Sequence, residues 1–303
     1  MKQPAADPAS GQPFRAIAAV LLGVALLALN DSLIKSLTGS YPVGELLFVR
    51  GLFVAPWIAL LAYRHGGISS LRVRNWRGQA LRGASVIAGA FLFVNGLRHL
   101  PLADAVAVTF TGPMFITALA PLVLGERVGW RRWMAVLAGF IGVLVMVRPT
   151  ALFGGAGTLQ LAILLPLGAA LCGSARDLIT RRLAQSESSV AVLFFTSAAV
   201  MLAGLCTAPF GWVVPRAADL WVLAASGALV AGAYYFQIEA FRLGEAVLVA
   251  PFKYTSMIWA VLLGFLMFGD LPDGWTLLGA ACVIAAGLYI LRRETRRGRA
   301  TAA

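Results

Sequence analysis

Long apolar segments alternate with short polar ones along almost the whole chain. Each apolar segment holds about 20 residues, the length that an α-helix needs to cross the hydrocarbon core of a bilayer. The connections are short and often carry Pro or Gly, as at Tyr41-Pro42 and Leu100-Pro101. We therefore predict an all-α polytopic membrane protein with ten transmembrane helices. The predicted helices span residues 14–37, 43–63, 78–98, 101–124, 130–148, 158–181, 188–209, 218–241, 245–268 and 274–292.

The composition agrees with a location in the membrane. Hydrophobic residues make up 60% of the 303 residues and charged residues only 13%, against about 25% charged residues in soluble domains. The net charge of +12 would suit a nucleic-acid-binding protein, but the basic residues lie mainly in the gaps between apolar segments, so no nucleic-acid partner is expected. Cys172, Cys206 and Cys282 fall inside apolar segments, without metal-binding or disulfide spacing.

The basic residues also predict which side of the membrane each loop faces, because Lys and Arg are enriched in cytoplasmic loops. With the N-terminus inside, eighteen basic residues fall on the inner side, Arg82 among them, and three on the outer side. The other four, Lys35, Arg50, Arg176 and Lys253, lie within helices. One helix more or fewer would scramble this distribution, so it supports ten helices with both termini cytoplasmic.

The two halves of the chain resemble each other at an offset of about 145 residues. The matching blocks include Asp31 with Asp177, Ala88–Phe93 with Ala231–Phe236, Phe110-Thr111-Gly112 with Tyr254-Thr255-Ser256, and Gly129-Trp130 with Gly274-Trp275. Each repeat holds five helices, and because five is odd, the second repeat enters the membrane with opposite polarity. Such inverted repeats are typical of secondary transporters, which bind substrate near the midplane between the halves.

Several motifs resemble the drug/metabolite transporter superfamily, in its ten-helix EamA-type branch. They are Leu100–Val106, Gly125-Glu126-Arg127, Gly129-Trp130, Gly139 with Gly142, Gly244-Glu245-Ala246, Ala250-Pro251-Phe252, and Gly269-Asp270, where the family usually has Glu. The resemblance covers residues 14–292. We expect two five-helix EamA-like repeats at 14–148 and 158–292, an outer linker at 149–157, a disordered cytoplasmic tail at 1–13 and a basic cytoplasmic tail at 293–303.

The resemblance implies a secondary transporter that moves small metabolites across the bacterial inner membrane by alternating access, without ATP. Asn30-Asp31-Ser32 with Lys35 and Arg50-Gly51 is similar to a subgroup linked to amino-acid-like and S-adenosylmethionine-like cargo. We therefore expect an amino-acid-like or other zwitterionic or amine substrate. The expected partners are this small molecule, membrane lipids and a proton gradient as a candidate energy source, with the protein a monomer or weak dimer.

Two other function classes stay open. One is an intramembrane enzyme that acts on a lipid-linked substrate, which would need acidic or His clusters that segments 149–157 and 210–217 lack. The other is a channel or a non-transporting structural membrane subunit, against which the inverted repeat argues. The sequence contains no P-loop, GxGxxG, HExxH, GxSxG or paired-His motif, so we expect no catalytic residue, no cofactor and no metal site.

Ionisable residues inside the helices mark candidate functional sites, because a charge near the bilayer centre is costly. Asp31 and Lys35 lie one turn apart on the first helix, where they would bind a zwitterion, couple transport to protons or form a local ion pair. Arg50 is interpreted as a structural partner of Asp31 or Glu45, with a ligand-binding role as the alternative. Asp177 matches Asp31 in the second repeat and either contributes to the site or snorkels to the interface.

Lys253 is the strongest single candidate for a substrate-binding residue. It lies eight residues into the ninth helix, about 12 Å deep at 1.5 Å per residue. Pro251 predicts a break in the helix there, because it has no backbone N–H to donate. The carbonyl left without a donor then needs a cavity or a neighbouring side chain. Lys253 would bind a substrate carboxylate or, as the alternative, form a buried pair with Glu239 or another acid.

The remaining candidates would line a substrate-binding cavity together with Lys253. Thr109 and Thr111 lie beside a second expected helix break at Pro113 and would bind substrate or bond to carbonyls one turn back. For the aromatic and amide candidates, core packing is the alternative role. These candidates are Asn95, Tyr234, Tyr235, Tyr254 and Trp259.

Overall fold

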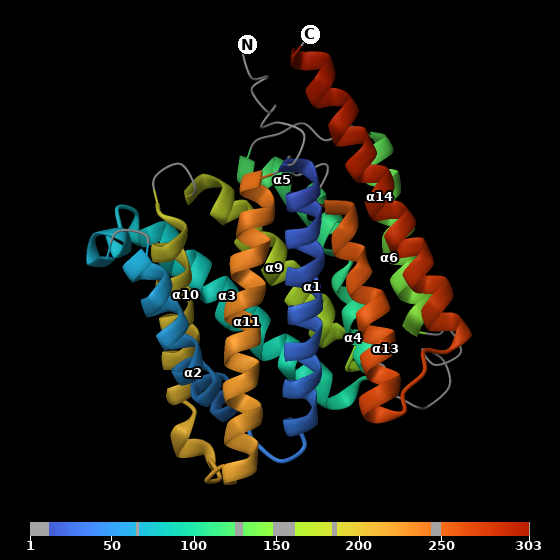
Figure 1. The fold of residues 1–303 in the computed structure, drawn as a ribbon. Helices are drawn as coiled ribbons and strands as arrows, with labels where there is room; N and C mark the ends of the chain where they lie inside the picture. The colour runs from blue at the N-terminus through green and yellow to red at the C-terminus, as the bar shows by residue number, and fades with distance from the viewer. Residues whose placement is uncertain are drawn as a thin grey trace, which may run out of the picture.

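The computed structural model describes residues 12–64, 67–124, 130–147, 161–183, 187–243 and 250–302. Within these ranges the chain is all-α, without a β-strand, and it makes ten helical passes through one bundle (Figure 1). The first repeat comprises α1 (Gln12–Leu37), α2 (Val43–Arg64), α3 (Trp76–His99), α4 (Leu102–Thr109) with α5 (Gly112–Leu124), and α6 (Trp130–Val147). The second comprises α9 (Leu164–Leu183), α10 (Ser189–Leu205), α11 (Ala217–Leu243), η3 (Ala250–Thr255) with α13 (Ser256–Phe268), and α14 (Gly274–Ala302). The short 3₁₀ turns η1 (Gly67–Leu71) and η2 (Ala208–Phe210) lie in connections.

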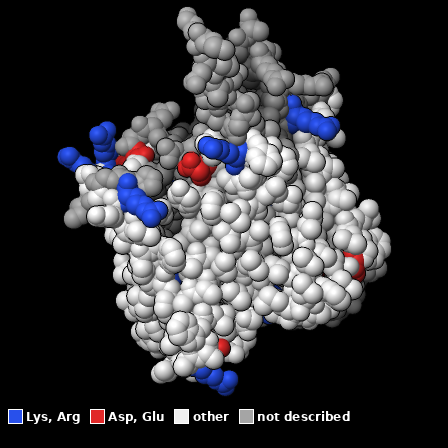
Figure 2. Space-filling model, in the orientation of Figure 1, with Lys and Arg blue, Asp and Glu red and all other residues white. Residues whose placement is uncertain are grey.

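The surface of the bundle suits a bilayer. Five helices of the described chain are each long and apolar enough to cross a membrane, and four shorter apolar helices accompany them. The second half of α9 is less apolar, because it carries Arg176, Asp177, Arg181 and Arg182. Figure 2 shows an uncharged band around the visible face, with most basic side chains gathered at the end where α1 begins and α14 ends.

Helix packing follows the internal repeat. α2 packs against α10, and α6 packs against α14, so that each helix contacts its own counterpart in the other repeat. α1 packs along α11, and the matching helices α9 and α3 pack along each other. These reciprocal contacts are those of two inverted repeats related by a pseudo-two-fold axis in the membrane plane. The predicted fold class is confirmed.

The fourth predicted helix, 101–124, is interrupted at Phe110-Thr111. Pro113 has no N–H to donate to the carbonyl of Thr109, and the chain tightens there through bonds from Phe110 N to Ala107 O (3.2 Å) and Thr111 N to Val108 O (3.1 Å). The second repeat has its irregular turn η3 at the matching place. The Phe110 and Tyr254 rings, which match each other in the repeat, meet edge-to-face with centroids 5.1 Å apart. The two interruptions therefore lie beside the pseudo-two-fold axis.

Several helix ends differ from the prediction. α3 begins earlier, because the Asn75 side chain accepts a bond from Gly78 N. α9 begins at Leu164 rather than 158, with Pro166 in its first turn. α10 ends at Leu205 rather than 209, because Pro209 cannot continue it. α14 continues past 292 to Ala302 through residues with good helix propensity.

Some predicted features lie outside the described residues. They are the linker 149–157, most of the N-terminal tail, and the motifs Gly125-Glu126-Arg127 and Gly244-Glu245-Ala246.

Glycines let two helices of the bundle approach closely. A Cβ atom on Gly204 of α10 would lie 2.5 Å from the carbonyl oxygen of Gly44 on α2 and 2.9 Å from the backbone nitrogen of Phe48. Backbone atoms cannot yield as a flexible side chain would. This contact is the close packing of small residues that holds membrane helices together.

Candidate functional site

Polar side chains from both repeats converge in the middle of the bundle. We call this set the central charged cluster: Asp31 of α1, Arg50 of α2, Arg82 of α3, Arg176 and Asp177 of α9, Tyr234 of α11 and Lys253 of η3. Each member interacts electrostatically with at least one other member of the cluster. The cluster thus joins residues up to about 220 positions apart in the sequence.

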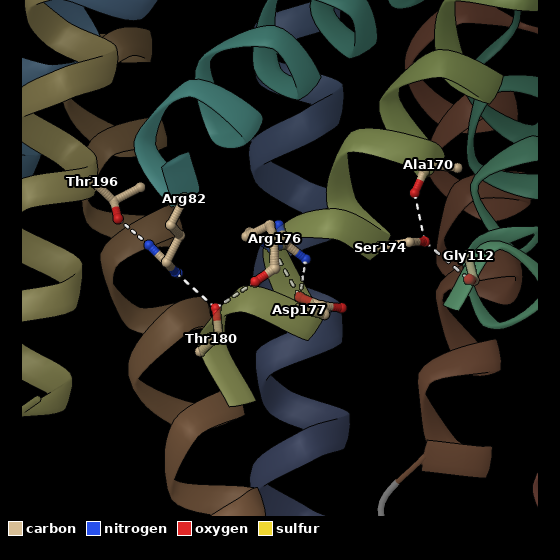
Figure 3. Close-up of polar contacts among 8 residues, drawn as sticks. All are labelled: Arg82, Gly112, Ala170, Ser174, Arg176, Asp177, Thr180 and Thr196. Atoms are coloured by element: carbon tan, nitrogen blue, oxygen red, sulfur yellow. Dashed lines mark hydrogen bonds and ion pairs between the residues drawn. The ribbon is translucent and has the colours of Figure 1, made fainter. Parts of the chain in front are cut away.

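Arg176 and Asp177 form an ion pair within the cluster. Both Nε (2.9 Å) and Nη2 (2.8 Å) of Arg176 reach Oδ1 of Asp177 (Figure 3). The two side chains keep 34% and 43% of their surface exposed, so a small molecule or water can reach them. Lys253 lies within electrostatic range of both. Ser174, one turn earlier, donates to Gly112 O (2.9 Å) and so holds α9 against the start of α5.

Asp31 accepts a hydrogen bond from a neighbour on its own helix and interacts electrostatically with Arg50. The Asn30 amide donates to Asp31 Oδ1 (2.9 Å), while Asn30 Oδ1 accepts a bond from the Ser226 hydroxyl of α11 (2.7 Å). Arg50 lies within electrostatic range of Asp31 and Tyr234. Glu45, the alternative partner for Arg50, instead accepts a bond from Val213 N (3.1 Å). The structure therefore favours Asp31 as the partner of Arg50.

Lys35 points away from Asp31, and the local ion pair considered for these two residues does not form. Lys35 Nζ donates to Leu100 O (2.5 Å) and Leu97 O (3.4 Å) and lies 3.8 Å from Asp270 Oδ2. These contacts connect α1 to the end of α3 and to the end of α13. Lys35 thus closes one end of the bundle and does not belong to the central charged cluster.

Arg82 is the cluster member that sequence reasoning missed, because it lies in the first turns of the predicted helix 78–98 and was counted with the basic residues of the inner side. Its Nε donates to Thr180 Oγ1 of α9 (2.8 Å) and its Nη1 to Thr196 Oγ1 of α10 (Figure 3). The residue is 9% exposed. The available signal was its place inside that predicted helix, because the Asn75 cap moves the start of α3 only two residues earlier, from 78 to 76.

Three of the predicted site residues have their polar groups bonded within their own helices. Thr109 donates to Val106 O (2.6 Å), Thr111 to Val108 O (2.8 Å), and the Asn95 amide to Phe91 O (2.8 Å). Thr111 is fully buried. Bonds of this kind satisfy a hydroxyl locally, which was the alternative interpretation for both threonines.

The aromatic candidates divide between the cluster and the core. Tyr254 packs edge-to-face on Phe110 and so tightly against α14 that a Cβ on Gly287 would overlap its hydroxyl. Trp259 packs against two groups of buried core residues. Tyr235 meets Phe236 edge-to-face, with ring centroids 5.4 Å apart.

The other three predicted positions are placed by their elements alone. Glu239 is half-buried one turn after Tyr235 on α11, Pro113 lies in the first turn of α5, and Pro251 lies in η3.

The family comparison matches the two repeats separately. A model of the EamA-like transporter family matches residues 14–148 and 160–292, almost the whole chain. The chain belongs to this family. The expected family is therefore confirmed, and EamA-like repeats account for the reciprocal helix packing.

Curated relatives of this EamA-like protein are transporters with different cargo names. A riboflavin transporter of Rhizobium johnstonii is 36% identical over 251 residues, covering 82% of this chain and 79% of the relative. An S-adenosylmethionine uptake transporter of Rickettsia prowazekii is 28% identical over 280 residues, covering 91% and 92%. A pseudopaline exporter of Pseudomonas aeruginosa is 25% identical over 287 residues, covering 92% and 96%. The protein is an integral membrane transporter of a small metabolite in a bacterial membrane.

A solved crystal structure has the same fold. It superimposes with a TM-score of 0.65 at 22% identity and covers 92% of this chain and 98% of its own.

Proposed function

We propose that this transporter moves amino-acid-like or other zwitterionic or amine metabolites across the inner membrane by alternating access. The observation that carries the proposal is the central charged cluster, which draws both acids and cations from the two repeats. A substrate with groups of both signs would contact both halves at once. Movement of one half against the other would then carry the substrate from one side to the other.

The proposed binding residues are the predicted members of the cluster: Asp31, Asp177, Tyr234 and Lys253. A substrate amine would lie against Asp31 or Asp177, and a carboxylate against Lys253. Asp31, the acid without a strong ion pair, is also the proposed proton carrier if the gradient drives transport. The protein would act without a cofactor, as a monomer or weak dimer.

Opening toward one side requires that the contacts of Lys35 break. Lys35 joins α1 to the carbonyls at the end of α3 and to Asp270 after α13. These elements can therefore separate only when the hydrogen bonds and the ion pair of Lys35 break. We propose that this end faces outward and that the termini are cytoplasmic. The gathering of basic side chains at the opposite end supports this orientation (Figure 2). Single-cysteine labelling in intact cells tests it: Thr207→Cys should react with an impermeant maleimide and Ser69→Cys should not.

The transport proposal is tested with the purified protein in proteoliposomes. Candidate substrates come from comparing medium and cytoplasmic metabolites in cells with and without the protein, and counterflow then measures exchange. We expect saturable exchange that Lys253→Ala reduces at least tenfold, while the control Arg98→Gln, at the exposed end of α3, exchanges at the wild-type rate. A folded protein that exchanges none of the enriched metabolites would contradict the proposal.

A further inference from the structure

The central charged cluster contains more cations than acids. Among the described residues it holds four cations and two acids, and its three arginines alone outnumber the acids. A charge inside a membrane protein is costly unless another charge or strong hydrogen bonds compensate it. The excess therefore points to an anionic group that is supplied from outside the chain.

Arg82 has hydrogen bonds but no acidic partner. Its two bonds go to the neutral hydroxyls of Thr180 and Thr196, and both hydroxyls donate in turn to backbone carbonyls one turn back, each at 2.6 Å. No carboxylate of the described residues pairs with Arg82, although the residue is only 9% exposed. The two threonines thus fix the guanidinium in place without neutralising it. A guanidinium has five N–H donors, so three remain for a ligand.

Arg50 of α2 is similarly available. It donates no hydrogen bond within the described part of the chain, and its side chain is half-buried. Asp31 lies within electrostatic range, but no ion pair joins the two residues. The planar donor fork of Arg50 is therefore free to bind a planar or tetrahedral oxyanion at two points.

Tyr234 marks the place where the arginines converge. Arg50, Arg82 and Arg176 all lie within electrostatic range of its phenol. The residue is 38% exposed, and its hydroxyl donates to no described group. A phenol O–H beside two partly unused guanidinium groups would complete a set of donors directed at one negatively charged ligand.

We infer that the site takes an organic anion, whose carboxylate or phosphate group sits between Arg50 and Arg82 beside the Tyr234 hydroxyl. This inference rests on the proposed function and narrows it, because the substrate then carries more acidic than basic groups. Asp31 and Asp177 remain to bind any amine of the same molecule. Arg176 is already engaged by Asp177 and helps to set the positive potential.

The first experiment measures ligand-induced thermal stabilisation of the purified protein in detergent. The probes are succinate and glutamate for carboxylates, glycerol 3-phosphate for phosphates, alanine as a zwitterion without excess charge, and choline as a cation. We expect saturable stabilisation by the dicarboxylates or by the phosphate ester, and none by alanine or choline. The two anionic arms distinguish the two oxyanion sources. Equal stabilisation by alanine or choline, or no stabilisation by any anionic probe at millimolar concentration, would overturn the inference.

Variants then locate the anion. Arg82→Gln keeps an amide donor at about the position of Nε, which bonds Thr180, but removes the charge, and we expect it to weaken anion binding at least tenfold, about 1.4 kcal/mol. Arg82→Lys should restore part of the affinity. If Arg82→Gln fails to fold, Arg50→Gln and Tyr234→Phe test the same anion-binding site. Arg98→Gln is the matched control on α3 and should bind like wild type. Wild-type affinity in folded Arg82→Gln would contradict the assignment.

Transport assays separate this inference from the proposed function. Counterflow of a neutral or cationic metabolite that no anion inhibits would refute the anion site and leave the transporter intact. Anion binding that depends on Arg82, without exchange in proteoliposomes, would support the anion site and count against transport.

Discussion

Two matching helix pairs of the bundle use opposite chemistry. Between α1 and α11, the Asn30 amide oxygen accepts a bond from the Ser226 hydroxyl (2.7 Å), and both residues are at most 1% exposed. In the counterpart pair, α9 and α3, Thr180 links Arg82 to the carbonyl of Arg176, the residue that matches Asn30 in the repeat. The first junction is neutral and closed. The second is cationic and, at Arg176, 34% exposed.

The difference shows how a duplicated scaffold acquires a site. The packing of the two pairs is the same, so the fold does not require either set of polar residues. A buried neutral hydrogen bond fixes two helices together and offers nothing to a ligand. An exposed junction of charged residues at the matching place makes the electrostatic potential of the interior positive. The α9–α3 pair therefore supplies one face of the proposed binding site, and the α1–α11 pair holds the bundle together beside it.

The largest effect is expected when the cationic junction is converted into its neutral counterpart. Arg176→Asn removes the ion pair with Asp177 and lowers the positive charge of the cluster. We expect transport to fall about tenfold to a hundredfold, the value of one charged hydrogen bond or two. Stability should fall by no more than about 1 kcal/mol, because the pair is solvent-accessible. Counterflow and thermal unfolding measure the two quantities. A large loss of stability with unchanged transport would place the structural role at Arg176 instead.

The packing that both repeats share predicts a second, purely structural effect. Gly204→Leu would force a side chain into the backbone of Gly44 and Phe48, and we expect a loss of about 2 kcal/mol in stability. Substrate affinity of the remaining folded protein should be unchanged, because Gly204 lies two turns from Thr196, the α10 residue that bonds Arg82. Thermal unfolding and ligand titration check this. Gly39→Leu, where a Cβ meets no atom within 4 Å, is the control and should unfold like wild type.

The neutral junction should respond in the opposite sense to the cationic one. Asn30→Leu leaves the fully buried Ser226 hydroxyl without its partner, at a cost of about 1–2 kcal/mol. The double variant Asn30→Leu with Ser226→Ala removes both polar groups and should recover most of that loss. Thermal unfolding of the single and double variants measures the recovery. If the double variant is no more stable than the single one, the Asn30–Ser226 bond is not what anchors this junction.

The fold was predictable because membrane helices leave long apolar segments and the repeat leaves matching motifs at one offset. The break near Pro113 was expected from the proline, but its exact place at Phe110-Thr111 was harder to predict, since the hydrophobic segment continues across it. Propensity alone does not decide whether such a proline bends or breaks a helix. The early start of α3 depended on one capping side chain, Asn75.

The site was predictable only in part. Asp31, Asp177, Tyr234 and Lys253 were found because charge and polarity inside an apolar segment are conspicuous. Arg82 lies close to a loop in sequence, and only the packing of α3 against α9 and α10 carries it to the centre. Thr109 and Thr111 were indistinguishable from ligand-binding hydroxyls in the sequence, because a bond to the helix's own backbone leaves no trace there.

The smallest expected effect is a pH dependence at the end of the neutral helix pair where α1 leads into α2. The Tyr41 hydroxyl donates to Asp219 Oδ2 (2.5 Å) and accepts a bond from Arg216 N (3.1 Å), which ties the α1–α2 turn to the start of α11. The bond to Asp219 raises the pKa of Tyr41, because ionisation would remove the donor and place two negative charges together. A tyrosine whose pKa is higher in the folded state stabilises the fold below its unfolded pKa of about 10, and this stabilisation is lost as the pH rises through the folded value. We therefore expect wild type to exceed Tyr41→Phe in thermal stability at about pH 8, with the gap narrowing toward about pH 11. Thermal unfolding of both proteins across this range measures the gap, and a gap that stays constant would show that Tyr41 supports the junction by packing alone.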